Sequence, residues 1–512
     1  MPFKLSGEAK KYIDGLSDSE IIKKIMKISG DTFKNEGMCI ISRIEKKRSI
    51  GISIINGEIN GITTNAKSGI GVHCIDKAGA SAFISSNTYP AVDFEDIMET
   101  IKKLINSSSA QKIKTNVDIF QLKPEVNIKI GEYKHPLKNY SLDQIISKLK
   151  ETNLKIKKIN DKKLSVATNF SVVQDEFIII RGDGTFSAFD MPRCAFSNSI
   201  TAKDQAGATT VHPRLGSSDL SVLFDDELYN DLLGQSVFYA DEALKVLSAP
   251  KVKPGKYKIV IDYALAKGLA HEAFGHAAES DLHKGSILWE NDKFIKGRKI
   301  ASDMVSIEDG PIFNDYAWQP VGANGNLRKT VEIVKDGVIN KSLADIFSNT
   351  DAGTENQNCE RIESFECPSI PRMTNIRLSY KNPIKTDKKF HEITPADVNK
   401  LIVENKLMPE DPETEILLLL GYKGGQVSTV NGDFVFNCSM IYKMNHDCNP
   451  ELYQPAIFAG KTLSTLKSIS GAIGPIKYDA LGTCGKNGQG VPSSGGSNYF
   501  VIVDKNDDIT IG

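Results

Sequence analysis

The sequence predicts an α+β protein, with a hairpin-rich N-terminal α/β domain followed by a β-rich C-terminal domain. Three observations carry this prediction. Amphipathic helices alternate with β-rich runs in the first half, Asn-Gly and Asp-Gly turns join several of these runs, and two prolines follow a long helix near residue 250. A chain of 512 residues exceeds one ordinary core, so two or three domains are expected.

The N-terminal domain is expected to cover residues 1–225, in two halves at about 18–107 and 120–225. In the first half, residues 18–35 have the apolar spacing of a helix, and Asn56-Gly57 between β-rich runs predicts a hairpin. A second helix is expected at about 93–106. Three serines at 107–109 then open a polar connector.

The second half repeats this order weakly. A helix is expected at about 141–152, before strands at 164–170 and 176–189, the latter turning around Asp183-Gly184. Residues 226–250 are then interpreted as a helix followed by a linker, because Pro250 and Pro254 come directly after the helical pattern.

The C-terminal domain is expected to cover residues 251–512. A strand at 257–261 leads into a helix whose N-cap is Asp262, and this helix carries a motif with two histidines. The remainder is β-rich, with hairpins at 331–343 and 415–435. The apolar alternation at 498–511 is expected to close the sheet.

Composition limits the possible partners and location. Lys and Arg number 63 against 64 Asp and Glu, so the net charge of −1 favours neither nucleic acid nor an anionic membrane as a partner. No apolar run approaches the ~20 residues that span a bilayer, and the first residues do not resemble a secretory signal. The eight cysteines include no C-x-x-C pair. A cytoplasmic protein is expected.

The motif HEAFGH at 271–276 is the strongest chemical signal in the chain. Two imidazoles beside a carboxylate supply nitrogen ligands for zinc and a base for its bound water. In the familiar H-E-x-x-H arrangement the histidines are four residues apart and share a helix face. Here His276 follows His271 by five residues, which turns it about 140° away on a regular helix. The rings can share a metal if the helix widens near Gly275; otherwise both histidines are structural.

A catalytic zinc ion usually takes three protein ligands, and the motif supplies two. The nearby candidates for the third are Glu279, Asp281 and His283, and the distant candidate is Cys484 in a glycine-rich segment. Lys486, two residues later, would favour the thiolate that a metal requires.

The sequence resembles the TldD/PmbA family, specifically its TldD-type metalloprotease subunit. Four segments carry the resemblance and cover most of 250–512: HEAFGHAAESD at 271–281, PRMTN at 371–375, GGQV at 424–427 with GDF at 432–434, and CGKNGQGVP at 484–492. The resemblance implies a zinc peptidase in which His271, His276 and Cys484 bind one Zn²⁺ and Glu272 is the catalytic base. It also implies unstructured peptides as substrates, and a homodimer or a heterodimer with a PmbA-type subunit.

Two alternatives stay open. One is a non-catalytic scaffold or regulatory subunit, such as a gyrase modulator, and the other is a structural zinc site with a fourth protein ligand. Substrate contacts are assigned to Arg372, Gly424 and Gly425. One departure concerns residues 320–326, PVGANGN, where the family pattern leads us to expect an acidic segment. This departure bears on substrate preference and subunit pairing.

Overall fold

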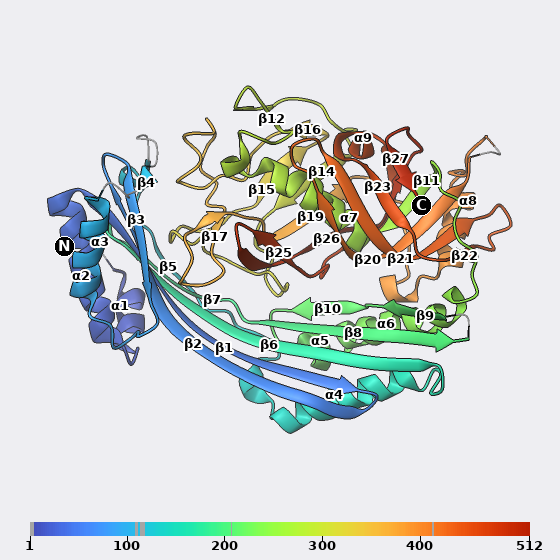
Figure 1. Ribbon diagram of the computed structural model, residues 1–512, viewed down its shortest axis with the longest axis horizontal. Helices are drawn as coiled ribbons and strands as arrows, with labels where there is room; N and C mark the ends of the chain where they lie inside the picture. Colours follow the sequence, from blue (N-terminus) through green and yellow to red (C-terminus); the bar gives the residue numbers. More distant parts are fainter. Residues whose placement is uncertain (1–4, 108–110, 113–117, 206, 412–413) are drawn as a thin grey trace.

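The computed structural model describes residues 5–107, 111–112, 118–205, 207–411 and 414–512. Long, curved strands of the N-terminal part form a shallow cradle, and the C-terminal part lies on its inner face (Figure 1). In this view helix α4 lies below the cradle, α5 and α6 lie beside β8 and β10, and α1, α2 and α3 cover one end. The α+β class is therefore confirmed.

The N-terminal strands of both expected halves form one sheet, which among the described residues has ten strands. Its order is β10-β8-β6-β1-β2-β3-β4, with β7 beside β5 and β6 and with β9 beside β8. The strands are β1 (Met38–Ile55), β2 (Glu58–Asp76), β3 (Ala80–Ser86), β4 (Gln111–Lys112), β5 (Val126–Lys129), β6 (Leu164–Arg181), β7 (Thr185–Asp190), β8 (Arg193–Asp204), β9 (Gly207–Val211) and β10 (Arg214–Ser217).

The turn chemistry of this half is confirmed, because Asn56 and Gly57 join β1 to β2 with positive φ angles. One strand prediction was wrong: β6 is continuous from Leu164 to Arg181, so the expected break near 170–176 does not exist. The pairing of β6 explains this, since its first part pairs with β8 and its last part with β7. The serine connector at 107–109 lies largely outside the described residues.

The four helices expected in the first 250 residues are present as α2, α3, α4 and α6, and two that were not expected, α1 and α5, accompany them. Their bounds are α1 (Gly7–Asp14), α2 (Ser19–Glu36), α3 (Phe94–Ile105), α4 (Leu142–Lys157), α5 (Ser221–Phe224) and α6 (Asp226–Val246). Side-chain caps begin several of them; Ser141 and Gln144 form a complete capping box at α4, for example. Helix α6 packs on both the N-terminal sheet and the C-terminal sheet, so it joins the two parts.

The C-terminal sheet has thirteen strands among the described residues, along the path β16-β15-β14-β19-β26-β11-β20-β21-β23-β27. Strands β22, β24 and β25 pair off this path. The bounds are β11 (Lys258–Asp262), β14 (Val305–Asp309), β15 (Val331–Lys335), β16 (Val338–Ile339), β19 (Asn375–Tyr380), β20 (Ile416–Val427), β21 (Asp433–Met444), β22 (Glu451–Tyr453), β23 (Ile457–Lys461), β24 (Ile469–Lys477), β25 (Gly482–Lys486), β26 (Gln489–Val503) and β27 (Ile509–Ile511).

The shorter elements of this part are α7 (Tyr263–Leu269), α8 (Pro395–Glu404), α9 (Thr462–Lys467) and two small hairpins, β12–β13 (Trp289–Glu290 with Lys293–Phe294) and β17–β18 (Glu360–Arg361 with Ile370–Pro371). Both expected hairpins, around Asp336-Gly337 and Asn431-Gly432, are present. The last residues behave differently from expectation. Only β27 lies at the sheet edge, whereas β26 occupies the middle between β19 and β11.

Residues 322–326, which belong to the segment that departs from the expected acidic pattern, are buried where the two parts meet. Arg43 of β1 donates to Ala323 O and Asn324 Oδ1, both at 2.7 Å. Arg181 of β6 donates to Asn324 O at 2.8 Å and to Asn326 Oδ1 at 2.6 Å. These neutral oxygens therefore accept hydrogen bonds from two buried guanidinium groups between the parts, and they are not on a surface available to a second subunit.

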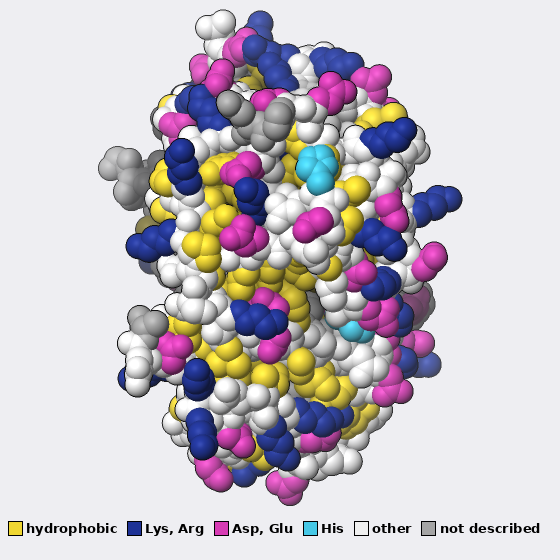
Figure 2. All heavy atoms as spheres, turned by 90° about the vertical axis from the view of Figure 1, so that its right-hand side faces the viewer, with side chains coloured by type: hydrophobic (Ala, Val, Ile, Leu, Met, Phe, Trp, Pro, Cys, Tyr) yellow, Lys and Arg dark blue, Asp and Glu magenta, His cyan; other side chains and the backbone are white. Residues whose placement is uncertain are grey.

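The exterior carries charges of both signs. On the face of Figure 2 these charges are interspersed, while hydrophobic side chains gather around a hollow in its middle. Among the described residues, no helix combines the length and apolar character needed to cross a bilayer.

Candidate metal centre

The HEAFGH motif lies where a regular helix changes its winding. Asp262 caps α7 by accepting from Leu265 N at 2.9 Å, and regular α-helix continues to Leu269. Residues Ala270–Gly275 form a π-helical turn, in which the backbone N–H of His276 donates to His271 O. Because this hydrogen bond joins residues five apart, it returns His276 toward the face of His271. The predicted widening is confirmed.

Gly275 permits this turn to pack closely. A methyl group at this position would lie 1.8 Å from Sδ of Met373 and 3.0 Å from Cδ1 of Ile376, closer than any van der Waals contact. Met373 belongs to the PRMTN segment at 371–375. Two motifs that lie about a hundred residues apart in the sequence are thus in direct contact, and the contact requires a residue without a side chain at 275.

His271, His276 and Cys484 converge at the end of this turn. Each offers one ligand atom, and these three atoms lie within 4.8 Å of one another. The Sγ of Cys484, on β25, is 3.3 Å from Nε2 of His276. The two imidazole rings are nearly perpendicular, at 86°, with centroids 5.1 Å apart. Among the described residues, this is the one group of three or more His, Cys, Asp or Glu side chains with such spacing.

The remaining nitrogen of each imidazole already has a partner. Nδ1 of His276 is 3.0 Å from Oε2 of Glu279, and Nδ1 of His271 is 3.2 Å from Oγ of Ser493. These contacts leave both Nε2 atoms for a shared ligand. A carboxylate behind a metal-binding histidine is the usual way to fix its tautomer and ring orientation.

Lys486 does not act as the sequence suggested. Its Nζ donates to Glu279 at 2.8 Å and to Asp281 at 2.6 Å, so its charge is used to hold these carboxylates. Glu279 is fully buried, and Asp281 forms an ion pair with Lys486. His283 contacts Ser280 O through Nδ1. Glu279 therefore reaches the cluster only behind His276, through its Nδ1 atom, while Asp281 and His283 contact groups outside the cluster.

The electrostatics of the cluster favour a thiolate at Cys484 and a neutral imidazole at His271. Burial, reinforced by the Lys267 cation, lowers the pKa of His271 well below its ordinary value, which keeps this ring neutral. Burial opposes a thiolate at Cys484, but the hydrogen bond to His276 lowers the pKa of this thiol overall. For His276, burial is outweighed by the Glu279 carboxylate, and its pKa is raised.

Glu272 lies beside the cluster and is partly exposed. Burial raises the pKa of its carboxyl group, while His276 and Lys267 oppose this effect. Among the described residues, no hydrogen bond or ion pair holds this carboxylate. An unpaired carboxylate with a raised pKa is suited to accept a proton, since general bases work best when their pKa approaches the working pH.

Arg372, to which the sequence assigned a substrate contact, is fully buried. Its guanidinium group donates to the backbone oxygen of Cys484 and, at 3.3 Å, to that of Gln489. These contacts position the strand that carries Cys484. Gly424 and Gly425 lie instead at the partly exposed end of β20, where a bulge interrupts its pairing with β21.

Sequence reasoning missed the residues that hold the cluster from outside. Ser493 accepts from Lys267 Nζ at 2.9 Å and contacts His271, so a buried lysine one helical turn before the motif orients its first histidine. Burial lowers the pKa of Lys267 to about 8. The spacing of Lys267 four residues before His271 was a visible signal, whereas nothing near Ser493 indicated its role.

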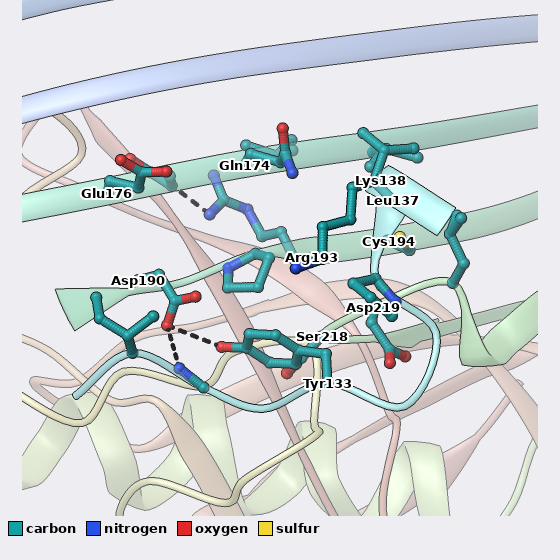
Figure 3. A pocket seen from close by; sticks show the side chains of 18 of the residues that line it. Tyr133, Leu137, Lys138, Gln174, Glu176, Asp190, Arg193, Cys194, Ser218 and Asp219 are labelled. Atoms are coloured by element: carbon teal, nitrogen blue, oxygen red, sulfur yellow. Dashed lines mark hydrogen bonds and ion pairs between the residues drawn. The ribbon is translucent and has the colours of Figure 1, made fainter. Parts of the chain in front are cut away.

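A separate cavity of about 410 Å³ lies in the N-terminal part, between β6, the 130–138 loop and residues 218–220 (Figure 3). Tyr133 points toward Asp190 there and donates to it at 3.0 Å. Arg193 donates to Asp175 at 3.3 Å. The cavity's polar groups thus largely satisfy one another, and none of its lining residues belongs to the His/Cys cluster.

Comparison with known proteins assigns the chain to a family. Residues 254–494 match the PmbA/TldA metallopeptidase C-terminal domain, residues 43–109 match domain 1, and residues 135–249 match the central domain. The chain therefore belongs to the PmbA/TldD family of metallopeptidases.

Relatives with curated names agree with this assignment. A metalloprotease of Methanocaldococcus jannaschii is 26% identical over 474 residues, covering 89% of this chain and 93% of that protein. A metalloprotease TldD homolog of Haemophilus influenzae is 24% identical and covers 74% of each chain. Among solved structures, TldE from Thermococcus kodakarensis has a TM-score of 0.69 at 13% identity, covering 96% of this chain and 100% of that one. The relatives' names identify proteases that use a metal.

Proposed function

We propose that this protein is a zinc-dependent peptidase that hydrolyses small or unfolded peptides, with His271, His276 and Cys484 as zinc ligands and Glu272 as the catalytic base. One observation carries the proposal. Two imidazole nitrogens and a cysteine sulfur converge within 4.8 Å beside a carboxylate that no protein group engages. A scaffold would not require that carboxylate.

The donor set fits zinc, which accepts nitrogen and sulfur ligands in a tetrahedral arrangement. Three ligands are expected at a catalytic site, where the fourth position is kept open, and four at a structural one. Because Glu279, Asp281 and His283 have other partners, the cluster favours the catalytic kind. A zinc ion bound there would polarise the scissile carbonyl group and lower the pKa of a bound water toward ~7.

The side chains around the cluster have two roles, proton transfer and orientation of the histidines. The Glu272 carboxylate accepts the proton of the attacking water and returns it to the nitrogen of the leaving amine. Glu279 holds the Nδ1 proton of His276, and Ser493 holds that of His271, so both rings keep their orientation during the reaction.

The end of β20 supplies a place for the substrate backbone. Strand β11 pairs with β20 only as far as Leu419, so the edge from Tyr422 to Val427 has no strand partner on that side among the described residues. Tyr422 lies against Gly268 of α7, and its pKa is raised by burial and then by Glu272. An extended peptide that pairs with this edge, near Gly424 and Gly425, would pass the base at Glu272.

We also propose that the protein acts in the cytoplasm and as a dimer, either homotypic or with a PmbA-type subunit. A reducing compartment keeps Cys484 available as a ligand. Exposed isoleucines near the tip of the β1–β2 hairpin, Ile55, Ile59 and Ile62, offer an apolar contact for a second subunit. Light scattering of the purified protein tests the dimer, and a monomer that is active on peptides would overturn it.

Substitution of the base and of a ligand tests the peptidase. Glu272→Gln keeps the shape and removes the base, so the protein should still bind one zinc while peptide cleavage falls by about 100-fold or more. Cys484→Ala should lose zinc itself. Metal analysis and cleavage of an unstructured peptide, with and without chelator, measure both effects. Cleavage by Glu272→Gln at the wild-type rate would refute the base assignment and favour a scaffold or a structural zinc site.

A further inference from the structure

Strand β10 brings a cation of the N-terminal part to the metal centre. This strand is the outermost of its sheet and lies on the side that faces the C-terminal part (Figure 1). A methyl group at Gly216 would lie 2.8 Å from Leu481 and 2.9 Å from Tyr316, so this face of β10 touches the segment that leads to Cys484. Alternate residues of a strand share a face, and Arg214 therefore points the same way as Gly216.

Arg214 lies near the unpaired edge of β20, because its strand touches Leu481 and Tyr316, and Tyr422 of β20 is within range of its charge. Its guanidinium group interacts electrostatically with the hydroxyl groups of Tyr422, Tyr263 and Tyr316. It also interacts with the Lys267 ammonium group. Tyr422 is also close to Glu272. Arg214 is half-buried. It lies on the N-terminal side of the seam, the contact between the N-terminal and C-terminal parts, whereas the proposed metal ligands lie on the C-terminal side.

Lys423 lies in the same seam, on β20 next to Gly424. Burial is the main reason why the pKa of His212 is lowered. The positive charges of Lys423 and Arg214 lower this pKa further. His212 precedes β10 and contacts Ser199 at 3.2 Å. The two cations thus lie near the same imidazole, one from each part of the chain, and Lys423 belongs to the end of β20 where a peptide is proposed to pair.

These two cations differ from the other cations around the centre. Lys267 is bound to Ser493, Lys486 to Glu279 and Asp281, Arg361 to Gln319 and two backbone oxygens, and Arg372 to the Cys484 strand. Arg214 and Lys423 have neither a hydrogen bond nor an ion pair among the described residues. Partly buried cations without an anion are costly unless a ligand supplies one.

We propose that Arg214, together with Lys423, binds a carboxylate of the peptide substrate and so selects peptides that carry one beside the scissile bond. The planar guanidinium group matches a carboxylate through two parallel hydrogen bonds, and Lys423 adds a second charge. The carboxylate is either the peptide's C-terminus or an acidic side chain. This inference rests on the proposed peptidase function and gives it a substrate preference.

Binding of uncut peptides measures this preference without the reaction. The zinc-loaded Glu272→Gln protein is titrated with fluorescent, unstructured peptides in matched sets: a free C-terminus against its amide, and an internal Glu against Gln. The peptide with the recognised carboxylate should bind about 10- to 100-fold more tightly than its neutral match, and the difference should shrink at high salt. The peptide pair that shows this difference in affinity identifies whether the C-terminal or the side-chain carboxylate is recognised.

Adding Arg214→Gln should remove most of that preference while zinc content stays at one per chain. Arg214→Lys should keep part of it, because the charge remains but the planar fork is lost. Arg48→Gln, a change at an exposed arginine of β1 remote from the seam, is the matched control and should keep the preference in full.

Equal affinity for every acidic and neutral pair overturns the inference, whether or not Arg214→Gln folds. So does a preference that survives in a folded Arg214→Gln protein. Failure of the peptidase proposal has a different result: Glu272→Gln would still cut peptides, or the wild type would cut none, while the binding preference could be measured as before.

Discussion

Adding one methyl group at Gly275 should disturb both stability and metal binding. The backbone at Gly275 is right-handed helical, so alanine meets no backbone strain there and gains about 1 kcal/mol in helix propensity. Its Cβ would, however, lie 1.8 Å from Sδ and 2.9 Å from Cε of Met373, which is fully buried. Overpacking of this kind costs about 1–3 kcal/mol. Because a separation of 1.8 Å is a severe overlap, the upper end of this cost applies, and after the gain in propensity we expect Gly275→Ala to lower the free energy of unfolding by about 2 kcal/mol.

The same displacement should reach the proposed zinc ligands, because His276 is the next residue. Zinc affinity should fall about tenfold or more, as it does when a contact behind a ligand is lost. Urea unfolding followed by tryptophan fluorescence reports the site directly, since Trp289 donates to Ala277 O at 3.0 Å. Competition with a chelating dye measures the zinc affinity.

Two further variants make this test specific. Gly285→Ala, where an added Cβ has open space within 4 Å, is the control and should leave both quantities unchanged. Met373→Ala alone removes buried atoms and should cost about 2–5 kcal/mol, but in that background Gly275→Ala should cost nothing further. Wild-type stability and zinc affinity in Gly275→Ala, or no rescue by Met373→Ala, would refute the close-packing argument.

Two more predictions follow from buried polar groups. Glu279→Gln removes the carboxylate behind His276 and should weaken zinc binding about 10- to 100-fold by dye competition, whereas Glu242→Gln, at a buried carboxylate bound to Tyr442 and Lys245, should leave it unchanged. Buried His73 contacts Ser81 at 2.6 Å, and burial lowers the pKa of His73 to about 3. Below about pH 6.5 this histidine therefore binds a proton in the unfolded chain but stays neutral in the folded state. Wild-type stability should therefore lose about 2 kcal/mol between pH 6.5 and 5 from this group, and His73→Gln should show a flatter pH profile over that window; equal profiles in urea titrations would contradict the burial argument.

Local patterns in the sequence predicted most elements of the fold. Apolar spacing and capping residues act over a few positions, so the helices and the Asn-Gly and Asp-Gly hairpins could be read from short windows. The five-residue spacing of His271 and His276 even predicted the change of winding that brings them together. By contrast, the continuous β6 and the central place of β26 depend on which strands pair, and the sequence does not record partners that are far apart along the chain.

The same division holds at the candidate metal centre. The residue types and spacing of HEAFGH and the CGKNGQGVP segment by themselves identified the metal ligands and the base as candidates. Only the tertiary structure decided that Lys486 serves Glu279 and Asp281, that Arg372 supports the Cys484 strand, and that Ser493 and Lys267 hold His271. It also brought Arg214 across the seam between the two parts. A buried charge is satisfied by whatever the fold places within hydrogen-bond reach, and that neighbour is set by the packing of distant segments, which no local pattern specifies.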